Sequence, residues 1–162
     1  MKVLVTGGLG FIGSSFIREL AKSEVYTIAN IDSESYASNL DAINEFEKIR
    51  KYSYYQGNIC DESFIHKVFQ EFSPDWVVNF AAETHVDRSI DSPQNFMDTN
   101  IFGTYNMLQS MDYYNKTKKS TFRFLHISTD EVYGDIQKVS PPDENSPYFP
   151  NSPYSASKAS SD

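Results

Sequence analysis

The chain has 162 residues, a length that suits one domain with its own hydrophobic core. Its formal net charge of −8 argues against a nucleic-acid or anionic-membrane surface, because both require basic patches. The single cysteine cannot form an intrachain disulfide, which is the usage expected in a reducing cytosol. No apolar run reaches the roughly 20 residues that span a bilayer, and no signal peptide precedes the first strand. We therefore expect a cytoplasmic protein that binds neither nucleic acid nor membrane.

Short apolar segments alternate with segments of helical periodicity along the chain. Strands are expected at residues 2–6, 25–31, 52–56, 76–80 and 122–128, and helices at 10–22, 40–49, 61–72, 93–114 and from 154 onward. Asp61 is expected to cap the third helix. Residues 135–153 hold five of the seven prolines and should form a loop. The alternation predicts an α/β fold, a doubly wound parallel sheet of the Rossmann type with crossover helices on both faces.

A glycine-rich loop lies between the first strand and the first helix. Gly7, Gly10 and Gly13 are spaced so that the backbone could turn tightly and approach a pyrophosphate at the helix N-terminus. A turn that only packs the helix against the strand is the alternative. Asp32 ends the second strand about 20 residues past the loop, where a carboxylate can accept both ribose hydroxyls of a dinucleotide. That carboxylate would repel a 2′-phosphate, and Ser33 supplies no compensating cation, so the sequence predicts NAD rather than NADP.

Two further segments follow the third and fourth strands. Gly57-Asn-Ile59 and Phe80-Ala-Ala-Glu-Thr84 come at strand ends, where open α/β sheets bind ligands. Ala81 and Ala82 would let the backbone approach a cofactor. Simple tight packing is the alternative explanation for two such small residues.

The last two groups of polar residues have the composition of a catalytic site. Ser128-Thr-Asp-Glu131 follows the fifth strand, and adjacent carboxylates can divide acid and base work if their environments separate their pKa values. A solvated loop with an aspartate cap is the alternative. Tyr154 and Lys158 project from one helical face, and a nearby lysine lowers the pKa of a phenol until it is a usable base near neutral pH. A Tyr-x-x-x-Lys pattern occurs often by chance, so it is evidence for a catalytic pair only together with the glycine loop.

The three histidines have no metal-ligand spacing among themselves or with Cys60. His66 is expected on a helix surface and His126 in a strand. The sequence therefore predicts no metal site.

The early Gly-x-x-Gly-x-x-Gly and the late Tyr-x-x-x-Lys resemble the extended short-chain dehydrogenase/reductases. Within that group, Ala81-Ala-Glu-Thr-His-Val-Asp-Arg-Ser89 and Ser128-Thr-Asp-Glu-Val-Tyr-Gly134 resemble the dTDP-glucose 4,6-dehydratases. The resemblance runs along the whole chain, in order and at the expected separations. The adjacent Asp130 and Glu131 distinguish the dehydratases from the epimerases of the same superfamily, which as a group lack this pair.

The sequence departs from the family pattern at two positions. Asn58 stands where the family usually has an aspartate that meets the adenine amino group, and an amide oxygen can still accept that hydrogen bond. Asn79 replaces a common histidine before the two alanines, with no consequence that the sequence alone predicts.

The resemblance implies dehydration of a nucleotide sugar with NAD as cofactor. Tyr154, held as phenolate by Lys158, would remove the proton of the C4 hydroxyl while a hydride passes to NAD, which later returns it to C6. Glu131 would remove the C5 proton, and Asp130 would protonate the departing C6 oxygen. Thr129 would hydrogen-bond the C4 oxygen.

The resemblance also assigns the residues that contact the cofactor and the substrate. NAD would be bound by Gly7, Gly10, Phe11, Ile12, Gly13, Asp32, Ser33, Ser35, Asn58, Ile59, Phe80, Ala81, Ala82, Thr84, Thr99, Tyr154 and Lys158. Thr84 and Thr129 would contact the substrate, dTDP-glucose.

Members of this family are roughly twice as long as this chain, and the usual strand order needs at least one strand beyond the fifth. We therefore expect residues 1–162 to be an incomplete NAD-binding Rossmann domain that lacks the C-terminal substrate-binding domain and is inactive by itself. The resemblance implies a homodimer of the full-length form, paired through the helix around 100–111 and the helix from 154. Two alternatives stay open: another epimerase or dehydratase of the superfamily, and a catalytically inert NAD-binding fragment.

Overall fold

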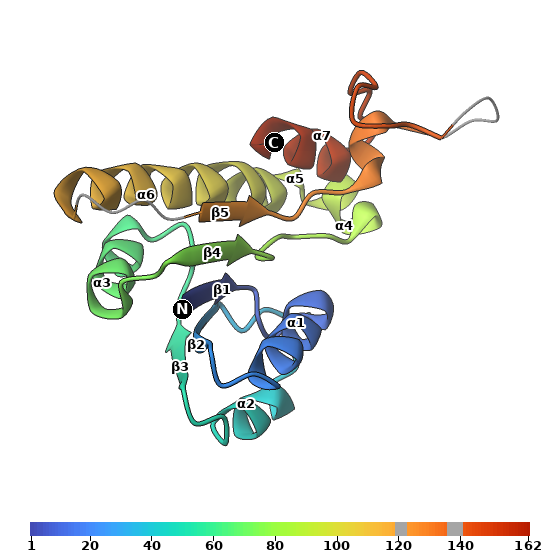
Figure 1. Cartoon of the computed structure of the whole chain (residues 1–162). Coiled ribbons are helices and arrows are strands. Elements are labelled where there is room, and N and C mark those ends of the chain that lie inside the picture. The colour runs from blue at the N-terminus through green and yellow to red at the C-terminus, as the bar shows by residue number, and fades with distance from the viewer. Residues whose placement is uncertain (119–122, 136–140) are drawn as a thin grey trace.

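Five parallel strands form one sheet in the computed structural model, which describes residues 1–118, 123–135 and 141–162. In chain order they are β1 (Lys2–Thr6), β2 (Thr27–Asp32), β3 (Tyr52–Gln56), β4 (Trp76–Asn79) and β5 (Arg123–His126). They lie side by side in the order β3-β2-β1-β4-β5, and every neighbouring pair is parallel (Figure 1). The predicted doubly wound sheet is confirmed, and its strand order reverses between β1 and β4.

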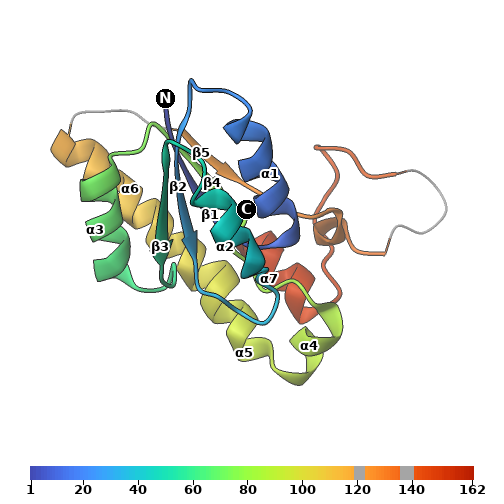
Figure 2. The same ribbon diagram turned by 90° about the horizontal axis from the view of Figure 1, so that it is seen from below.

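Helices cover both faces of the sheet (Figure 2). Helices α1 (Phe11–Ala21) and α2 (Asp41–Phe46) pack on one face, and α3 (Glu62–Phe72) and α6 (Thr104–Lys118) pack on the other. Successive strand residues point to opposite faces, so Val3 and Val5 join the core under α1 while Leu4 joins the core under α3 and α6. A strand buried on both sides requires an unbroken apolar run, as β1 has.

The predicted strand boundaries differ from the structure by at most two residues where the chain is described. β2 begins at Thr27 rather than at Val25, which is 66% exposed and lies before the sheet. It continues through Asp32, which pairs with β3. Phe122, the first residue of the predicted fifth strand, and residues 136–140 of the predicted loop lie outside the described residues.

Two of the predicted helices show how local sequence sets their ends. The Asp61 side chain accepts a hydrogen bond of 3.0 Å from the Phe64 N–H, so the predicted cap of α3 is confirmed. Helix α2 is shorter than predicted, because only Ala42 and Phe46 are buried in the core while Leu40 remains half exposed.

The long helix predicted over residues 93–114 is continuous but not uniform. It begins as α5 (Pro93–Phe96), widens into a π-helical segment, η1 (Met97–Gly103), and continues as α6 to Lys118. A Cβ on Gly103 would lie 2.6 Å from the Ile59 side chain, so glycine lets the helix approach the loop after β3. A short helix, α4 (Val86–Asp91), precedes it and is not predicted, because six residues are too few to show helical periodicity.

The final helix, α7 (Pro153–Ser161), begins close to the predicted residue. Pro153 occupies its first turn, and Ser152 and Ser155 form a reciprocal capping box. Helix α7 packs against α4 and η1 and lies beside the carboxyl end of β5 (Figure 1). This packing brings Tyr154 and Lys158 to the edge of the sheet where ligands bind.

Candidate active site

A cavity of about 480 Å³ opens at the carboxyl ends of the strands. Every residue that the sequence predicted for cofactor binding lines it: Gly7, Gly10, Phe11, Ile12, Gly13, Asp32, Ser33, Ser35, Asn58, Ile59, Phe80, Ala81, Ala82, Thr84, Thr99, Tyr154 and Lys158. Thr129 lines it too. Residues outside the predicted binding set complete the lining: Ile31, Ala37, Ser38, Gly57, Glu83, Ile127 and Ser128. The predicted residues therefore meet in one place, while their binding roles remain predictions.

The glycine loop packs against the chain that follows β4. Gly7 has a φ of 68°, and a Cβ there would lie 2.7 Å from the backbone nitrogen of Ala81, so a side chain does not fit. A Cβ on Gly13 would collide with the Gly7 carbonyl oxygen. Gly10 differs, because its backbone is extended and its nearest neighbour would be 3.2 Å away. Packing thus requires glycine at two positions, whereas Gly10 only keeps space free at the cavity.

Helix α1 starts at this cavity without a side-chain cap. The N–H groups of a first helical turn have no acceptor within the helix. Phe11 and Ile12, in this turn, are 90% and 59% exposed. The free donors and the positive end of the helix dipole suit an anion such as a pyrophosphate.

The Asp32 carboxylate is 5% exposed and holds the surrounding loops together. Its Oδ2 accepts from the Leu9 N–H at 2.9 Å, and its Oδ1 accepts from the Glu34 N–H at 2.9 Å and the Ser38 hydroxyl at 2.8 Å. A carboxylate has about four acceptor sites, so roughly one remains. Asp32 could accept both ribose hydroxyls, as the sequence predicts, only if Ser38 released its bond.

Asn58 and Ile59 line the cavity after β3. The Asn58 Oδ1 accepts a hydrogen bond of 2.9 Å from the Cys60 N–H. An amide oxygen has a second lone pair. The predicted hydrogen bond from an adenine amino group is therefore compatible with this geometry.

Asn100 ties the segment after β4 to helix α7. Its amide oxygen accepts from the Glu83 N–H at 2.9 Å, and its amide nitrogen donates to the Glu83 carbonyl at 2.9 Å and the Ser157 hydroxyl at 2.8 Å. Asn100 is 1% exposed and lies in the π-helical segment next to Thr99, which faces the cavity. Sequence reasoning missed Asn100, because a single asparagine in a helix carries no pattern.

Tyr154 is buried at the cavity and hydrogen-bonded to Thr129. Burial raises the pKa of Tyr154 above its usual value, the bond from Thr129 opposes the rise, and the carboxylates of Glu131 and Asp130 add to it. The lowered pKa that the sequence predicts is not found, because Lys158 is directed elsewhere.

The Lys158 ammonium points toward the end of β5 rather than toward Tyr154. Its Nζ donates to the Ile127 carbonyl oxygen at 2.6 Å and lies 3.1 Å from Nε2 of His126. The residue is 2% exposed, and burial lowers the pKa of Lys158 to about 8, with Asp162 acting in the opposite direction. Lys158 is therefore still mostly protonated at neutral pH.

The two acidic residues stand just beyond the described lining of the cavity, in the 3-10 helix η2 (Asp130–Tyr133). The Thr129 hydroxyl accepts from the Glu131 N–H at 3.3 Å and so begins this turn. Burial first, and the charge of Asp130 second, raise the pKa of Glu131. A raised pKa makes an ionised carboxylate a stronger base, which suits removal of a carbon-bound proton.

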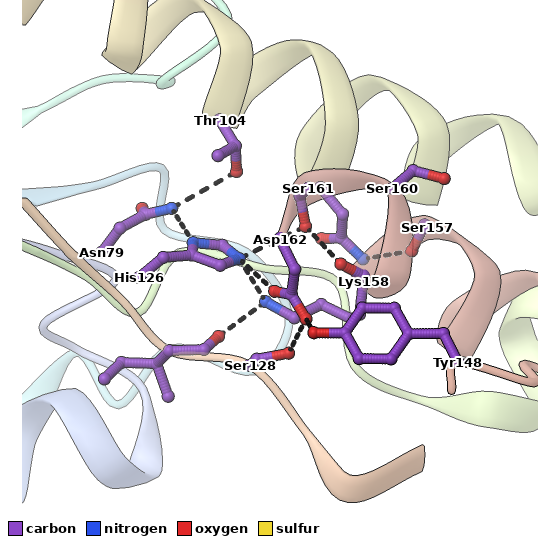
Figure 3. Close-up of polar contacts among 12 residues, drawn as sticks. Asn79, Thr104, His126, Ser128, Tyr148, Ser157, Lys158, Ser160, Ser161 and Asp162 are labelled. Carbon is purple, nitrogen blue, oxygen red and sulfur yellow. Dashed lines mark hydrogen bonds and ion pairs between the residues drawn. The ribbon is translucent and has the colours of Figure 1, made fainter. Parts of the chain in front are cut away.

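His126 and Asn79 form a partly buried polar group behind Lys158 (Figure 3). The His126 ring lies between the Asn79 amide on one side and Lys158, Ser161 and Asp162 on the other. His126 is the strand residue that the sequence predicts, but its contact with Lys158 joins positions 32 residues apart and has no local signal.

Within residues 1–118, 123–135 and 141–162, no three His, Cys, Asp or Glu side chains gather as a metal site would require. In the same part of the chain, no helix combines the length and apolarity needed to cross a membrane.

The family model for GDP-mannose 4,6 dehydratase matches residues 4–162. The chain belongs to this family. Among the relatives of this dehydratase family member, the dTDP-glucose 4,6-dehydratase of Haemophilus influenzae is 48% identical over 166 residues, and that of Salmonella typhimurium is 46% identical over 175 residues. The matches cover 99% and 100% of this chain, but 49% and 48% of the two relatives. The chain thus spans about half the length of the curated relatives it matches.

Solved structures of a dehydratase and of an epimerase are also similar to this chain over nearly its whole length. The dTDP-glucose 4,6-dehydratase of Streptomyces venezuelae, crystallised with NAD, superposes with a TM-score of 0.90 at 39% identity, over 99% of this chain and 49% of that one. A UDP-glucose 4-epimerase of Thermotoga maritima superposes with a TM-score of 0.86 at 31% identity, over 99% and 48%. The fold is common to both activities, and the dehydratase is the more similar in sequence, which confirms the resemblance.

Proposed function

We propose that this chain is the NAD-binding and catalytic half of a dTDP-glucose 4,6-dehydratase, an incomplete Rossmann domain. The observation that carries the proposal is a single cavity lined both by the glycine loop with Asp32 and by Thr129, Tyr154 and Lys158. Immediately beyond that lining stands the acid–base pair that a dehydration needs and an epimerisation does not. The similarity to dTDP-glucose dehydratases over nearly the whole chain supports the same conclusion.

The residues present fit NAD. The uncapped start of α1 offers free N–H groups to the pyrophosphate, and Gly10 leaves room for its approach. Asp32 retains an acceptor site for a ribose hydroxyl. Lys158 is the only cation among the described residues that line the cavity, and it lies near β5, three strands from β2. A 2′-phosphate would thus meet a carboxylate without a compensating charge, which favours NAD over NADP.

NAD, when bound, would take up a hydride from C4 of the sugar and return it to C6. Tyr154 would take the proton of the C4 hydroxyl, and Thr129, to which Tyr154 is already hydrogen-bonded, would hold the C4 oxygen. Since burial raises the pKa of Tyr154, the phenol needs a nearby positive charge, and Lys158 is the residue able to supply it. Glu131, with its raised pKa, would take the C5 proton and give it back to C5 when the hydride returns to C6, and Asp130 would give a proton to the departing C6 oxygen, which leaves as water.

We also propose that the complete protein is a homodimer. Phe102, Tyr105 and Leu108 are 60%, 56% and 44% exposed and follow one another at helical spacing on η1 and α6. Apolar side chains on one side of a helix favour burial against another surface. A second copy of the same helix is the partner that the family resemblance implies.

The activity is tested in a chimera that joins this chain to the C-terminal half of the Haemophilus influenzae relative. We expect it to convert dTDP-glucose into a 4-keto-6-deoxy product. Tyr154→Phe should remove this activity, whereas Tyr113→Phe, at an exposed tyrosine of α6 outside the cavity, should not. NAD content of each purified chimera controls for folding. A C4 epimer as the product, or full dehydration by Tyr154→Phe, would contradict the proposal.

A further inference from the structure

A partly buried histidine lies behind the lysine of the candidate site (Figure 3). His126 ends β5, its side chain is 13% exposed, and its Nε2 is 3.1 Å from Nζ of Lys158. We propose that His126 is a positioning residue: its neutral imidazole accepts a hydrogen bond from the Lys158 ammonium and directs that lysine at the cofactor. The inference rests on the proposed function, in which Lys158 contacts NAD.

The chemistry of the contact fixes the protonation of the ring. An ammonium has three N–H donors and no acceptor, so a ring nitrogen 3.1 Å away must supply a lone pair. A protonated imidazolium would instead set two cations and two donors face to face. Burial, and next the charge of Lys158, lower the pKa of His126 to about 4, while Asp162 opposes them. At neutral pH His126 is therefore uncharged, with Nε2 unprotonated.

The ring proton then lies on Nδ1, which needs an acceptor. Nδ1 is 3.1 Å from Nδ2 of Asn79, a residue that is 1% exposed, whose Nδ2 also donates to the Thr104 hydroxyl and whose Oδ1 accepts from the Thr6 hydroxyl. The oxygen and nitrogen of an amide have nearly the same shape, so the hydrogen-bond pairing assigns them. In the proposed arrangement this amide is turned over, so that its oxygen accepts from Nδ1–H and its nitrogen donates to the Thr6 hydroxyl oxygen, and in this orientation Asn79 fixes both the tautomer and the orientation of the ring. This is the consequence of Asn79 that the sequence alone did not reveal.

Counting the donors of Lys158 shows what the arrangement does. One N–H goes to the Ile127 carbonyl at 2.6 Å and a second goes to His126. The third remains for the cavity, which Lys158 lines. Two fixed bonds thus orient the third donor before the cofactor arrives, and pre-organisation of this kind favours binding.

The other groups around the ring are compatible with this role. From α7 and the residue after it, the Ser161 hydroxyl lies 3.2 Å and the Asp162 carboxylate 3.7 Å from Nε2. From β5, the Phe124 ring stacks on the imidazole at an interplanar angle of 4°. Lys158 and Asp162 are the charged groups that act on His126, and Asp162 also acts on Lys158. The competing explanation is that His126 only fills space between β5 and α7.

Long-range proton–nitrogen NMR of the 162-residue chain tests the bond itself, with His66 and His85 as internal references. We expect His126 to remain neutral and protonated on Nδ1 from about pH 5 to pH 8. Lys158→Met should raise the pKa of His126, because a neighbouring cation is lost, whereas Lys67→Met, at an exposed lysine of α3, should not. The proposal is overturned by an Nε2–H tautomer in the wild type, or by a His126 titration that does not respond to Lys158→Met.

NAD binding by the same chain tests the purpose of the bond. His126→Gln keeps an acceptor near Nε2, whereas His126→Met fills similar space without one. We expect the methionine variant to lose about tenfold in NAD affinity and the glutamine variant to stay within about threefold of wild type. His66→Met on α3 is the matched control, and thermal melting confirms that each variant is folded. Equal losses with Gln and Met, or no loss with Met, would overturn the positioning role.

Failure of the proposed function gives a different result. If Lys158→Met binds NAD as tightly as wild type, Lys158 does not contact the cofactor. The proposal that His126 positions Lys158 for NAD is then wrong as well. The NMR experiment still decides whether the His126–Lys158 bond exists in that case. If Lys158→Met weakens NAD binding and the histidine variants do not, the function stands and only the inference about His126 fails.

Discussion

The backbone N–H of Leu9 donates a hydrogen bond of 2.9 Å to Oδ2 of Asp32, which ties the glycine loop to the end of β2. The carboxylate that would meet the cofactor is thus also a structural acceptor. Glu34 and Ser38 use its other oxygen in the same way. Replacement of Asp32 by alanine would leave these donors without a partner and disturb the loops, so a substitution that tests selectivity must keep the acceptor.

We predict that the wild-type chain binds NAD more tightly than NADP, and that Asp32→Asn narrows the difference by about tenfold or more. The asparagine retains an oxygen for the Leu9 N–H, loses the oxygen that accepts from Glu34 and Ser38, and removes the charge that repels a 2′-phosphate, so thermal melting must confirm that the variant is folded. Calorimetric titration with both cofactors measures the ratio. Asp41→Asn, at an exposed residue of α2, is the matched control. Equal affinity of the wild type for NAD and NADP would contradict the selectivity argument.

A companion substitution tests how much of Asp32 is available to a ribose. Ser38→Ala frees one acceptor site on Oδ1 without altering any charge. If the ribose takes two hydrogen bonds, we expect Ser38→Ala to strengthen NAD binding by about threefold. Unchanged or weaker binding would mean that the Ser38 bond holds the loop in its binding conformation.

We predict that Gly10→Ala abolishes detectable NAD binding and leaves the melting temperature nearly unchanged. The backbone of Gly10 is extended, and an added Cβ would lie 3.2 Å from the Gly7 carbonyl oxygen, a tight contact that a shift of a few tenths of an ångström relieves, so we expect only a small loss of stability. The same Cβ enters the cavity where the pyrophosphate would approach. Gly13→Ala is the contrasting variant, because its Cβ collides with the Gly7 carbonyl oxygen and should destabilise the fold. Normal NAD binding by Gly10→Ala would favour a turn that only packs the helix against the strand.

Much of the sheet and the cavity is predictable from the sequence, and there is a physical reason. Parallel strands bring their carboxyl ends to one edge, so Asp32, Asn58 and Thr129 meet once the strands are located. The position of Gly7 is predictable for a similar reason, because the glycine motif marks the turn that packs against Ala81. Locating the strand ends was therefore enough to predict the part of the lining that follows the strands, whereas Thr99 was assigned only by the family resemblance.

Contacts between distant polar residues were not predictable in the same way. Asn79 and His126 are 47 residues apart, and neither belongs to a periodic pattern from which their contact could be predicted. The protonation of Tyr154 was also beyond the sequence, because it depends on burial and on where the Lys158 ammonium points. A spacing of four places two side chains on one helical face, but it does not make them touch.

In the chimera, we predict that Glu131→Gln blocks elimination while oxidation at C4 continues. The amide cannot accept the C5 proton, whereas Tyr154 still serves the C4 hydroxyl. Product analysis, together with the near-ultraviolet absorbance of reduced cofactor, separates the two steps. Glu144→Gln, at an exposed glutamate of the same region, is the control. Release of 4-keto-6-deoxy product by Glu131→Gln at an undiminished rate would show that Glu131 is not the base that removes the C5 proton.

Asp130→Asn should have two effects in the same chimera. The elimination rate should fall, because the C6 oxygen loses its proton donor. The acid limb of the pH–rate profile should also move to lower pH. The charge of Asp130 is one of the causes that raise the pKa of Glu131, so its removal lowers that pKa. A slower enzyme with an unshifted acid limb would mean that Glu131 is not the base whose ionisation is observed.

Arg88 and Tyr36 contact each other next to segments that line the cavity, although neither lines it, and we predict that Arg88→Ala speeds NAD release. The Arg88 guanidinium lies 3.7 Å from the centre of the Tyr36 ring, which joins the loop after β2 to α4. An exposed cation–π contact stabilises by about 0.5–1 kcal/mol, so release should accelerate about threefold. Stopped-flow displacement of the cofactor measures it. Arg123→Ala, which breaks a similar stack on Trp76 outside the cavity, is the control. An unchanged release rate for Arg88→Ala would show that this contact does not retain the cofactor.

His126 should also make the chain sensitive to mild acid. The pKa of His126 is 6.5 as an ordinary histidine and about 4 in the fold, because burial and Lys158 disfavour its charge. Between these values the unfolded chain binds a proton that the folded chain does not, so the free energy of unfolding falls as pH drops from about 6.5 to about 4. The loss is about 3 kcal/mol and levels off below that range. His126→Gln has no such proton, and carboxylates elsewhere titrate alike in both proteins, so the wild type should lose more stability than the variant in this window. Urea unfolding of both chains at a series of pH values gives the comparison, and parallel curves from pH 7 to pH 4 would contradict a buried, neutral His126.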